Sequence, residues 1–284
     1  MTPLLSVRDL RVSFPTRSGR FEAVRGVSFD LGRERLGVVG ESGSGKSMTG
    51  RAILGLVRPP GTVAAGRMEL GGQSILNLPE RRMRRLRGAR ISMVMQDPKF
   101  SLNPVMTVGR QIMEGYRLHS GESRAAARDK ALEMLRAVQI RDPERVFHAY
   151  PHEVSGGMGQ RIMIAMMLAP DPEILIADEP TSALDVSVRN EVLRILDRLV
   201  SARGMGLIFI SHDLNLVAQF CDRVLIMYAG RVVEELPARD LHAAKHPYTQ
   251  GLLNSLPRLD RPVDRLAVLQ RQQGWRDAPP AGAP

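Results

Sequence analysis

A glycine-rich octapeptide near the N-terminus has the residue types that bind phosphate. It consists of Gly40, Glu41, Ser42, Gly43, Ser44, Gly45, Lys46 and Ser47. Glycines have no Cβ, so backbone N–H groups can close around an anion, and a following helix points its positive end at the same anion. Lys46 would reach the β- and γ-phosphates of a nucleotide, and the Ser47 hydroxyl would bind Mg²⁺. A chance glycine-rich turn is the alternative, but an apolar run at residues 36–39 and a helical pattern from Met48 supply the strand and helix that the motif requires.

Two acidic residues follow a second apolar run and could serve the same phosphates. Asp178 and Glu179 come directly after residues 174–177, which are all apolar. The carboxyl ends of strands in an open α/β sheet face the binding crevice, so an acid there can hold Mg²⁺ through water. The adjacent acid can take a proton from an attacking water. A solvated turn is the alternative for this pair taken alone.

Length and composition set limits on the class of protein. The chain has 284 residues, enough for one large domain or two modest ones, and 43% of them are hydrophobic. No run approaches the roughly 18 apolar residues of a membrane span, and the N-terminus predicts no secretory signal. The single cysteine, Cys221, cannot form an internal disulfide, which fits a reducing cytosol.

The net charge of +10 allows several anionic partners. Its densest cluster, at residues 81–90, is rich in arginine and has no interleaved aromatics to stack bases. We therefore interpret the cluster as a solvated helix face, with an anionic membrane surface as the second interpretation.

Hydrophobic periodicity predicts an α/β protein. Strands are expected at residues 5–14, 23–24, 27–31, 66–70, 91–95, 174–178, 206–211, 224–227 and 231–234. Helices are expected at residues 48–57, 108–146, 161–168 and 188–200. The first strands would form a small antiparallel layer, and the continuously apolar ones would be buried in a parallel sheet. The proline-rich C-terminal end is interpreted as a mobile tail.

A third motif identifies a family. Residues 155–161, Ser-Gly-Gly-Met-Gly-Gln-Arg, resemble the signature sequence of ATP-binding cassette (ABC) ATPases. The other motifs of that family occur in family order: an aromatic for adenine stacking at Phe14, the phosphate loop, the Q-loop glutamine at Gln96, the strand-end acids, the D-loop ending at Asp185 and the switch histidine at His212.

The resemblance implies a P-loop NTPase fold of ABC type. This fold has a mostly parallel RecA-like sheet, an N-terminal antiparallel β layer and an α-helical subdomain. We expect the ATPase domain at residues 1–257, its helical subdomain at about residues 100–160, and the tail at residues 258–284. By analogy, the membrane-facing surface would lie near residues 96–104 and in the helical subdomain.

The resemblance also assigns roles. Glu179 would be the general base, His212 would hold the γ-phosphate and the water in line, and Gln96 would sense the γ-phosphate and contact Mg²⁺ together with Ser47 and Asp178. The signature residues Ser155, Gly156, Gly157 and Gln160 would cap the γ-phosphate bound by a second subunit. Asp185 would contact that subunit, so each protomer would hold half of each active site.

Two further segments are similar to the importer branch for oligopeptides, dipeptides and nickel. They are residues 101–104, Ser-Leu-Asn-Pro, and residues 246–249, His-Pro-Tyr-Thr. The resemblance implies ATP and Mg²⁺ as ligands, and as partners a homologous or identical second ATPase, two transmembrane permease subunits and, indirectly, a solute-binding protein. The protein would be peripheral on the cytoplasmic face of the bacterial membrane. The cysteine cluster of many peptide-type members is absent, so no iron–sulfur site is expected.

Peptide is the first choice of solute, and nickel or another metal chelate is the second. A soluble ABC ATPase acting on nucleic acid or ribosomes is the competing class, but such proteins usually carry two cassettes or a coiled-coil insertion, and we expect no nucleic-acid partner. A regulatory module without turnover is the third interpretation, and Glu179 and His212 argue against it.

Overall fold

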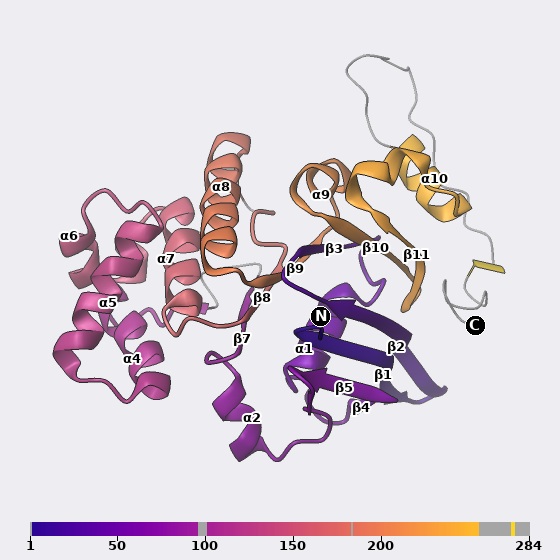
Figure 1. The fold of residues 1–284 in the computed structure, drawn as a ribbon, viewed down its shortest axis with the longest axis horizontal. Helices are drawn as coiled ribbons and strands as arrows, with labels where there is room; N and C mark the ends of the chain where they lie inside the picture. Colours follow the sequence, from indigo (N-terminus) through magenta and orange to yellow (C-terminus); the bar gives the residue numbers. More distant parts are fainter. Residues whose placement is uncertain (1, 96–100, 183, 256–273, 276–284) are drawn as a thin grey trace. The chain divides into compact units, whose positions relative to one another are not determined.

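The chain divides into two units in the computed structural model (Figure 1). The structure describes residues 2–95, 101–182, 184–255 and 274–275. The first unit contains residues 1–77 and 208–284, and the second contains residues 78–207. The domain limits expected from the sequence stay a prediction, and all of the expected tail at residues 258–284 except positions 274–275 lies outside the described residues.

An antiparallel sheet in the first unit is the layer expected from the alternating N-terminal sequence. Its strands are β1 (Leu5–Thr16), β2 (Gly19–Leu31), β4 (Thr62–Ala64), β5 (Arg67–Leu70) and β6 (Gln73–Ser74), in the order β2-β1-β5-β6 with β4 also on β1. The two short strands predicted at residues 23–24 and 27–31 are one strand, because the pairing register shifts at Gly26 and then continues.

A second sheet in the same unit carries the phosphate loop. Here β11 (Arg231–Pro237), β10 (Arg223–Tyr228), β3 (Arg35–Val39) and β9 (Gly206–Ser211) are neighbours in that order, and the first two residues of β9 are the last two of the second unit. β10 is parallel to β3 and antiparallel to β11, which confirms the hairpin predicted around Ala229. Every residue of β9 is buried, as its continuous apolar run predicts.

The helical segments of this unit are short. They are α1 (Lys46–Ile53), α9 (Leu214–Phe220), a 3₁₀ segment (Ala238–Ala243) and α10 (Pro247–Asn254). α1 ends four residues before the predicted end at Val57, and it begins at Lys46 instead of Met48, directly after the glycine-rich loop.

Two parallel strands and most of the helices form the second unit. β7 (Ile91–Val94) pairs with β8 (Ile174–Asp178), and all residues of both strands are buried. The helices are α2 (Glu80–Leu86), α4 (Val108–Ser120), α5 (Arg124–Ala137), α6 (Pro143–His148), a 3₁₀ turn (Pro151–Glu153), α7 (Gly156–Leu168) and α8 (Val186–Arg203). α4 to α7 pack on one another, as Figure 1 shows.

The helical region predicted at residues 108–146 is three helices because local signals interrupt it. Gly121 ends α4 in the left-handed conformation, and the Ser123 side chain caps α5. Asp142 caps α6 in the same way. α7 begins at Gly156, five residues before the predicted start, because the Ser155 side chain accepts the Met158 N–H and caps the helix there.

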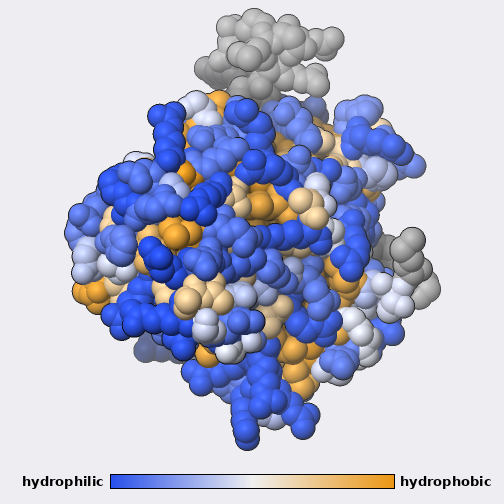
Figure 2. All heavy atoms as spheres, turned by 60° about the vertical axis from the view of Figure 1, so that its left-hand side comes forward, coloured by the Kyte–Doolittle hydropathy of each residue, from blue (hydrophilic) through white to orange (hydrophobic). Residues whose placement is uncertain are grey.

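The surface of the molecule is mostly hydrophilic on the face shown in Figure 2, with hydrophobic residues in separate small patches. Within the described part of the chain, no helix combines the length and the apolar character needed to cross a bilayer.

We predict that the thiol of Cys221 is unreactive in the folded protein. Cys221 follows α9, and its burial raises the pKa of the thiol from 9.0 to about 12. The reactive thiolate should therefore be roughly 1,000-fold scarcer at pH 8 than in an ordinary cysteine. Iodoacetamide labelling followed by mass spectrometry should be slow in buffer and fast in denaturant; equal labelling rates would contradict the packing of this residue.

Candidate active site

The phosphate loop lies so close to neighbouring backbone that two of its positions have no room for a side chain. A Cβ at Gly40 would lie 2.1 Å from the Met227 carbonyl oxygen, and a Cβ at Gly45 would lie 2.6 Å from the Ala23 carbonyl oxygen. Gly45 is also the N-cap of α1, with φ 100°, which side chains rarely adopt. The loop is therefore shaped by packing against β2 and β10 as well as by its own sequence.

Inside the loop, the Lys46 ammonium group is held by backbone carbonyls. It donates to the Gly40 carbonyl at 2.7 Å and to the Glu41 carbonyl at 2.8 Å, and the residue is 5% exposed. These oxygens satisfy a charge that would be costly to bury alone. The Ser44 N–H donates to the Glu41 carbonyl at 3.2 Å, which closes the turn beneath the lysine. The ammonium is thus held at the loop, where an anion would meet it.

Two features of the loop fit an anionic ligand. The Ser44 hydroxyl is buried and has no hydrogen-bond partner among the described residues. A Cβ at Gly43 would meet nothing within 4 Å, so the space in front of this residue is open. Ser47, half-buried in the first turn of α1, lies at the positive end of the helix. A loop with these properties can bind a phosphate group.

The first unit also holds two other predicted residues. Phe14 is half-buried in β1 and pairs with Phe21 of β2, and its ring packs beside Gly61. His212 directly follows β9 and is exposed. The backbone turn after it is tied by Asp213, whose N–H donates to the Ser211 hydroxyl at 3.0 Å and whose side chain caps α9.

The strand-end acids lie in the second unit, at the end of β8. Asp178 is 5% exposed, whereas Glu179 is half-buried. Glu179 has φ 47°, a left-handed conformation that is uncommon for a non-glycine residue. Ser182 holds this turn by donating its N–H and its hydroxyl to the Glu179 carbonyl, at 3.3 and 3.2 Å. Strain of this kind is typical of functional positions, because the surroundings must hold the residue in place.

The signature residues form an exposed helix N-terminus in the same unit. Ser155 caps α7, accepting the Met158 N–H at 3.4 Å, and Gly156 begins the helix. A Cβ at Gly156 would meet nothing within 4 Å, so a ligand can approach these N–H groups. Gln160 is buried, and its Nε2 atom has no hydrogen-bond partner among the described residues. The arrangement is a 13-residue helix with an open N-terminus, and helix N-termini of this kind can bind anions.

Asp185, the predicted contact to a second subunit, is the N-cap of α8. Its carboxylate accepts the Val188 N–H at 3.0 Å and the Ser187 hydroxyl at 2.9 Å. The hydrogen bond from the Val188 backbone N–H lowers the pKa of this carboxyl group most, and the hydrogen bond from the Ser187 hydroxyl lowers it further. Asp185 is therefore ionised at neutral pH and exposed for a partner to reach.

Each unit therefore contains a part of the predicted site. The phosphate loop, Phe14 and His212 belong to the first unit, and the acids, the signature residues and Asp185 belong to the second. Gln96 lies outside the described residues. The sequence interpretation missed Tyr248 of α10, whose hydroxyl accepts the Glu41 N–H of the phosphate loop at 3.1 Å. The signal was present in the segment at residues 246–249, which served only to indicate the importer branch.

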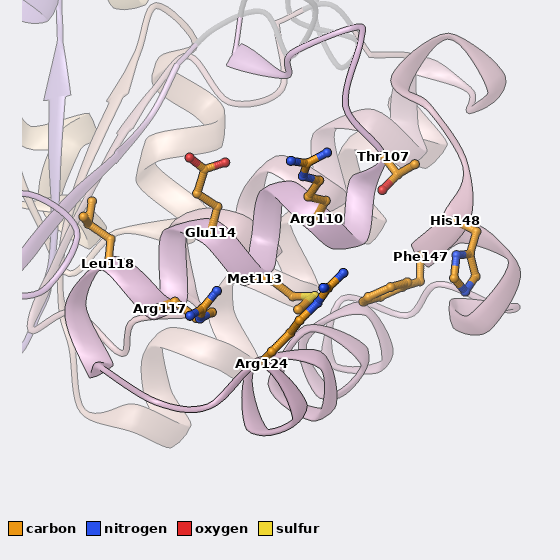
Figure 3. Close-up of a pocket in the computed structure, with 9 residues that line it drawn as sticks. All are labelled: Thr107, Arg110, Met113, Glu114, Arg117, Leu118, Arg124, Phe147 and His148. Atoms are coloured by element: carbon orange, nitrogen blue, oxygen red, sulfur yellow. The ribbon is translucent and has the colours of Figure 1, made fainter.

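A groove of about 800 Å³ lies on the second unit, and none of its lining residues belongs to the predicted site (Figure 3). Its lining residues come from α4, α5 and α6 and the residue before α4: Thr107, Arg110, Met113, Glu114, Arg117, Leu118, Arg124, Phe147 and His148. None of its three arginines forms an ion pair with a residue that the structure describes. Leu118 is 77% exposed, so the groove combines positive charge with exposed apolar surface.

Two protein-family models together match most of this chain. The family model described as ABC transporter matches residues 24–182. The model described as oligopeptide/dipeptide transporter, C-terminal region, matches residues 233–284, which include α10 and Tyr248.

Similar proteins agree with these matches. The chain is 51% identical to a probable peptide ABC transporter ATP-binding protein of Sinorhizobium fredii, over 89% of this chain and 77% of that protein. It is 47% identical to the dipeptide transport ATP-binding protein of Haemophilus influenzae, over 94% of this chain and 82% of that protein. It is also similar to a solved dimeric ATP-binding cassette in a post-hydrolysis state bound to ADP and Pi. The TM-score is 0.74 and the sequence identity 26%, and the match covers 83% of this chain and 99% of that chain. These results confirm the predicted fold class.

We predict that Lys46→Ala removes tight nucleotide binding. Charge-assisted hydrogen bonds contribute about 1.5–3 kcal/mol, so the Kd for ATP should rise roughly 10- to 150-fold. Titration with a fluorescent ATP analogue measures this change. Lys245→Ala, which alters an exposed lysine beside α10, is the matched control and should bind normally. An unchanged affinity in Lys46→Ala would contradict the role of the loop.

Proposed function

Because the chain belongs to the ABC transporter family, we propose that it is the ATP-hydrolysing subunit of a peptide importer. The observation that carries this proposal is the phosphate loop, with its buried lysine and open front, in a chain whose C-terminal region matches the oligopeptide/dipeptide transporter model. The similar proteins are named for peptide and dipeptide transport, which favours peptide over nickel or another metal chelate as solute.

ATP binding would use groups of the first unit. The loop N–H groups and the N-terminus of α1 would receive the phosphates, and Lys46 would exchange its carbonyl partners for phosphate oxygens. Phe14 would stack on the adenine. The remaining loop residues would surround the phosphates through their backbone: Gly40, Glu41, Ser42, Gly43, Ser44, Gly45 and Ser47.

Mg²⁺ fits the donors present. The Ser47 hydroxyl, the Asp178 carboxylate and the Gln96 amide oxygen are hard oxygen ligands of the kind that Mg²⁺ prefers. The near-complete burial of Asp178 is consistent with a carboxylate held for such a role. When bound, the ion would neutralise charge on the β- and γ-phosphates.

Hydrolysis would use the turn after β8. Glu179 would accept a proton from a water molecule as the water oxygen bonds to the γ-phosphorus, and the bond to the β–γ bridging oxygen would break. His212 would orient that water and the γ-phosphate. The left-handed turn held by Ser182 supports this assignment because it fixes the backbone that carries the Glu179 side chain.

A second ATPase subunit, homologous or identical, would complete each site. The N-terminus of α7, with Ser155, Gly156, Gly157 and Gln160, would cap the γ-phosphate bound by that subunit. Asp185 would contact the same subunit. The dimeric state of the similar solved cassette and the open, exposed end of α7 support this arrangement.

The groove of the second unit would dock a permease subunit. Arg110, Arg117 and Arg124 outnumber the single acid Glu114, and Leu118 offers an apolar contact (Figure 3). This composition is complementary to an amphipathic acidic segment on the cytoplasmic side of a membrane protein. The chain would thus lie peripherally on the cytoplasmic face of the membrane, working with two permease subunits and indirectly with a solute-binding protein.

We predict that Glu179→Gln keeps ATP binding and loses turnover. The amide cannot accept the proton from water, so kcat should fall roughly 10²- to 10⁴-fold, about 3–5 kcal/mol of barrier. Phosphate release and nucleotide titration on the same preparation measure the two quantities.

Glu133→Gln, at an exposed position of α5, is the control for that substitution and should hydrolyse ATP at the normal rate. Normal turnover in Glu179→Gln would remove Glu179 from the mechanism.

We also predict that Arg117→Glu weakens assembly with the permease subunits. Reversing a groove charge places it against the acidic partner segment, so recovery of the complex from detergent should fall about 10-fold or more. ATP binding by the subunit alone should not change. Arg141→Glu, an exposed arginine of the same unit outside the groove, should assemble normally. Equal recovery of the two variants would exclude the groove as the docking surface.

A further inference from the structure

The segment at residues 246–249 contacts the phosphate loop through one side chain. Tyr248 in α10 is completely buried, and its hydroxyl accepts the Glu41 N–H at 3.1 Å. The two residues are 207 positions apart in the sequence. The C-terminal region therefore contributes a side chain that contacts the backbone of the phosphate loop.

The same peptide unit also holds the loop lysine. The peptide bond between Gly40 and Glu41 carries the N–H bonded to Tyr248 and the carbonyl bonded to the Lys46 ammonium at 2.7 Å. Because this unit is planar, its N–H and C=O rotate together. The Tyr248 hydroxyl consequently controls the direction of the carbonyl that positions Lys46.

The Tyr248 ring is itself held on several sides. The ring centroids of Tyr228 and Trp275 lie 4.6 and 6.1 Å from its own, and Trp275 is only 9% exposed. The start of α10 is fixed as well. The His246 Nδ1 atom accepts the Tyr248 N–H at 3.2 Å, and a Glu234 carboxylate oxygen accepts the Lys245 N–H at 2.6 Å. These contacts fix the orientation of the Tyr248 side chain and its hydroxyl. A residue that positions another group must itself be held in this way.

We propose that Tyr248 is a positioning residue for the phosphate loop, and that the C-terminal region sets the affinity for ATP through it. This inference rests on the proposed function in one respect, namely that the loop binds ATP. Without the hydroxyl, the Gly40–Glu41 peptide gains freedom to rotate in the nucleotide-free protein. Nucleotide binding must then order this peptide again, and the conformational entropy lost in doing so weakens binding. Tyr248 itself does not touch the nucleotide.

Tyr248→Phe in the full-length chain tests the proposal, because it removes the hydroxyl and keeps the buried ring. The loss of one neutral hydrogen bond predicts a roughly 2- to 13-fold rise in the Kd for a fluorescent ATP analogue and in KM. The kcat at saturating ATP should stay close to the wild-type value, because Tyr248 acts on the shape of the loop and not on the reacting atoms. A purely structural role would instead lower the melting temperature and leave the ratio of kcat to KM unchanged at equal amounts of folded protein.

Tyr228→Phe is the matched control. Tyr228 belongs to the same ring cluster, but its hydroxyl has no hydrogen-bond partner in the described part of the chain, so the substitution should leave Kd and KM unchanged. Trp275→Ala, which uncovers the Tyr248 ring, should raise Kd in the same direction as Tyr248→Phe. A wild-type Kd in Tyr248→Phe, or an equal rise in both Tyr→Phe variants, overturns the proposal.

Lys46→Ala separates this inference from the proposed function. If Lys46→Ala loses ATP binding while Tyr248→Phe binds like the wild type, the loop binds ATP and only the role of Tyr248 is wrong. If Lys46→Ala binds ATP like the wild type, the assignment of the loop fails, and the role of Tyr248 fails with it.

Discussion

The close approach of the phosphate loop to the backbone of its neighbours is the constraint on which the rest of the site depends. The Met227 and Ala23 carbonyl oxygens lie where side chains at positions 40 and 45 would be. This packing places the Gly40 and Glu41 carbonyls around the Lys46 ammonium and leaves the N-terminus of α1 directed to the front of the loop. A buried cation that already donates to carbonyl oxygens can exchange them for phosphate oxygens, which form stronger, charge-assisted hydrogen bonds.

The chemical roles are divided between the two units. The first unit contains the groups proposed to hold a triphosphate, and the second contains the acids after β8, the open end of α7 and the arginine-lined groove. The proposed general base Glu179 and the proposed docking groove therefore belong to one unit, whereas His212 belongs to the other. α4 lines part of the groove and packs on α7, whose N-terminus carries the signature residues.

Much of the fold could be predicted because the signals are local. Continuous apolar runs predicted the buried strands β8 and β9, and alternation predicted the antiparallel layer around β1. The errors were at element limits, where a single capping side chain decides the boundary. Ser155 moves the start of α7 to Gly156, and a register shift at Gly26 joins two expected strands into one. These effects depend on hydrogen bonds that periodicity does not describe.

By itself, the sequence determined the family and the chemical candidates, because the phosphate loop, the strand-end acids and the signature residues are defined by residue type at short spacing. The tertiary structure alone decided what surrounds them. The contact between Tyr248 and Glu41 joins residues 207 positions apart, and the carbonyls that crowd Gly40 and Gly45 come from strands on either side of the loop in sequence. Such contacts follow from the order in which strands pair and from where α10 packs, and neither is encoded by a local pattern of residues.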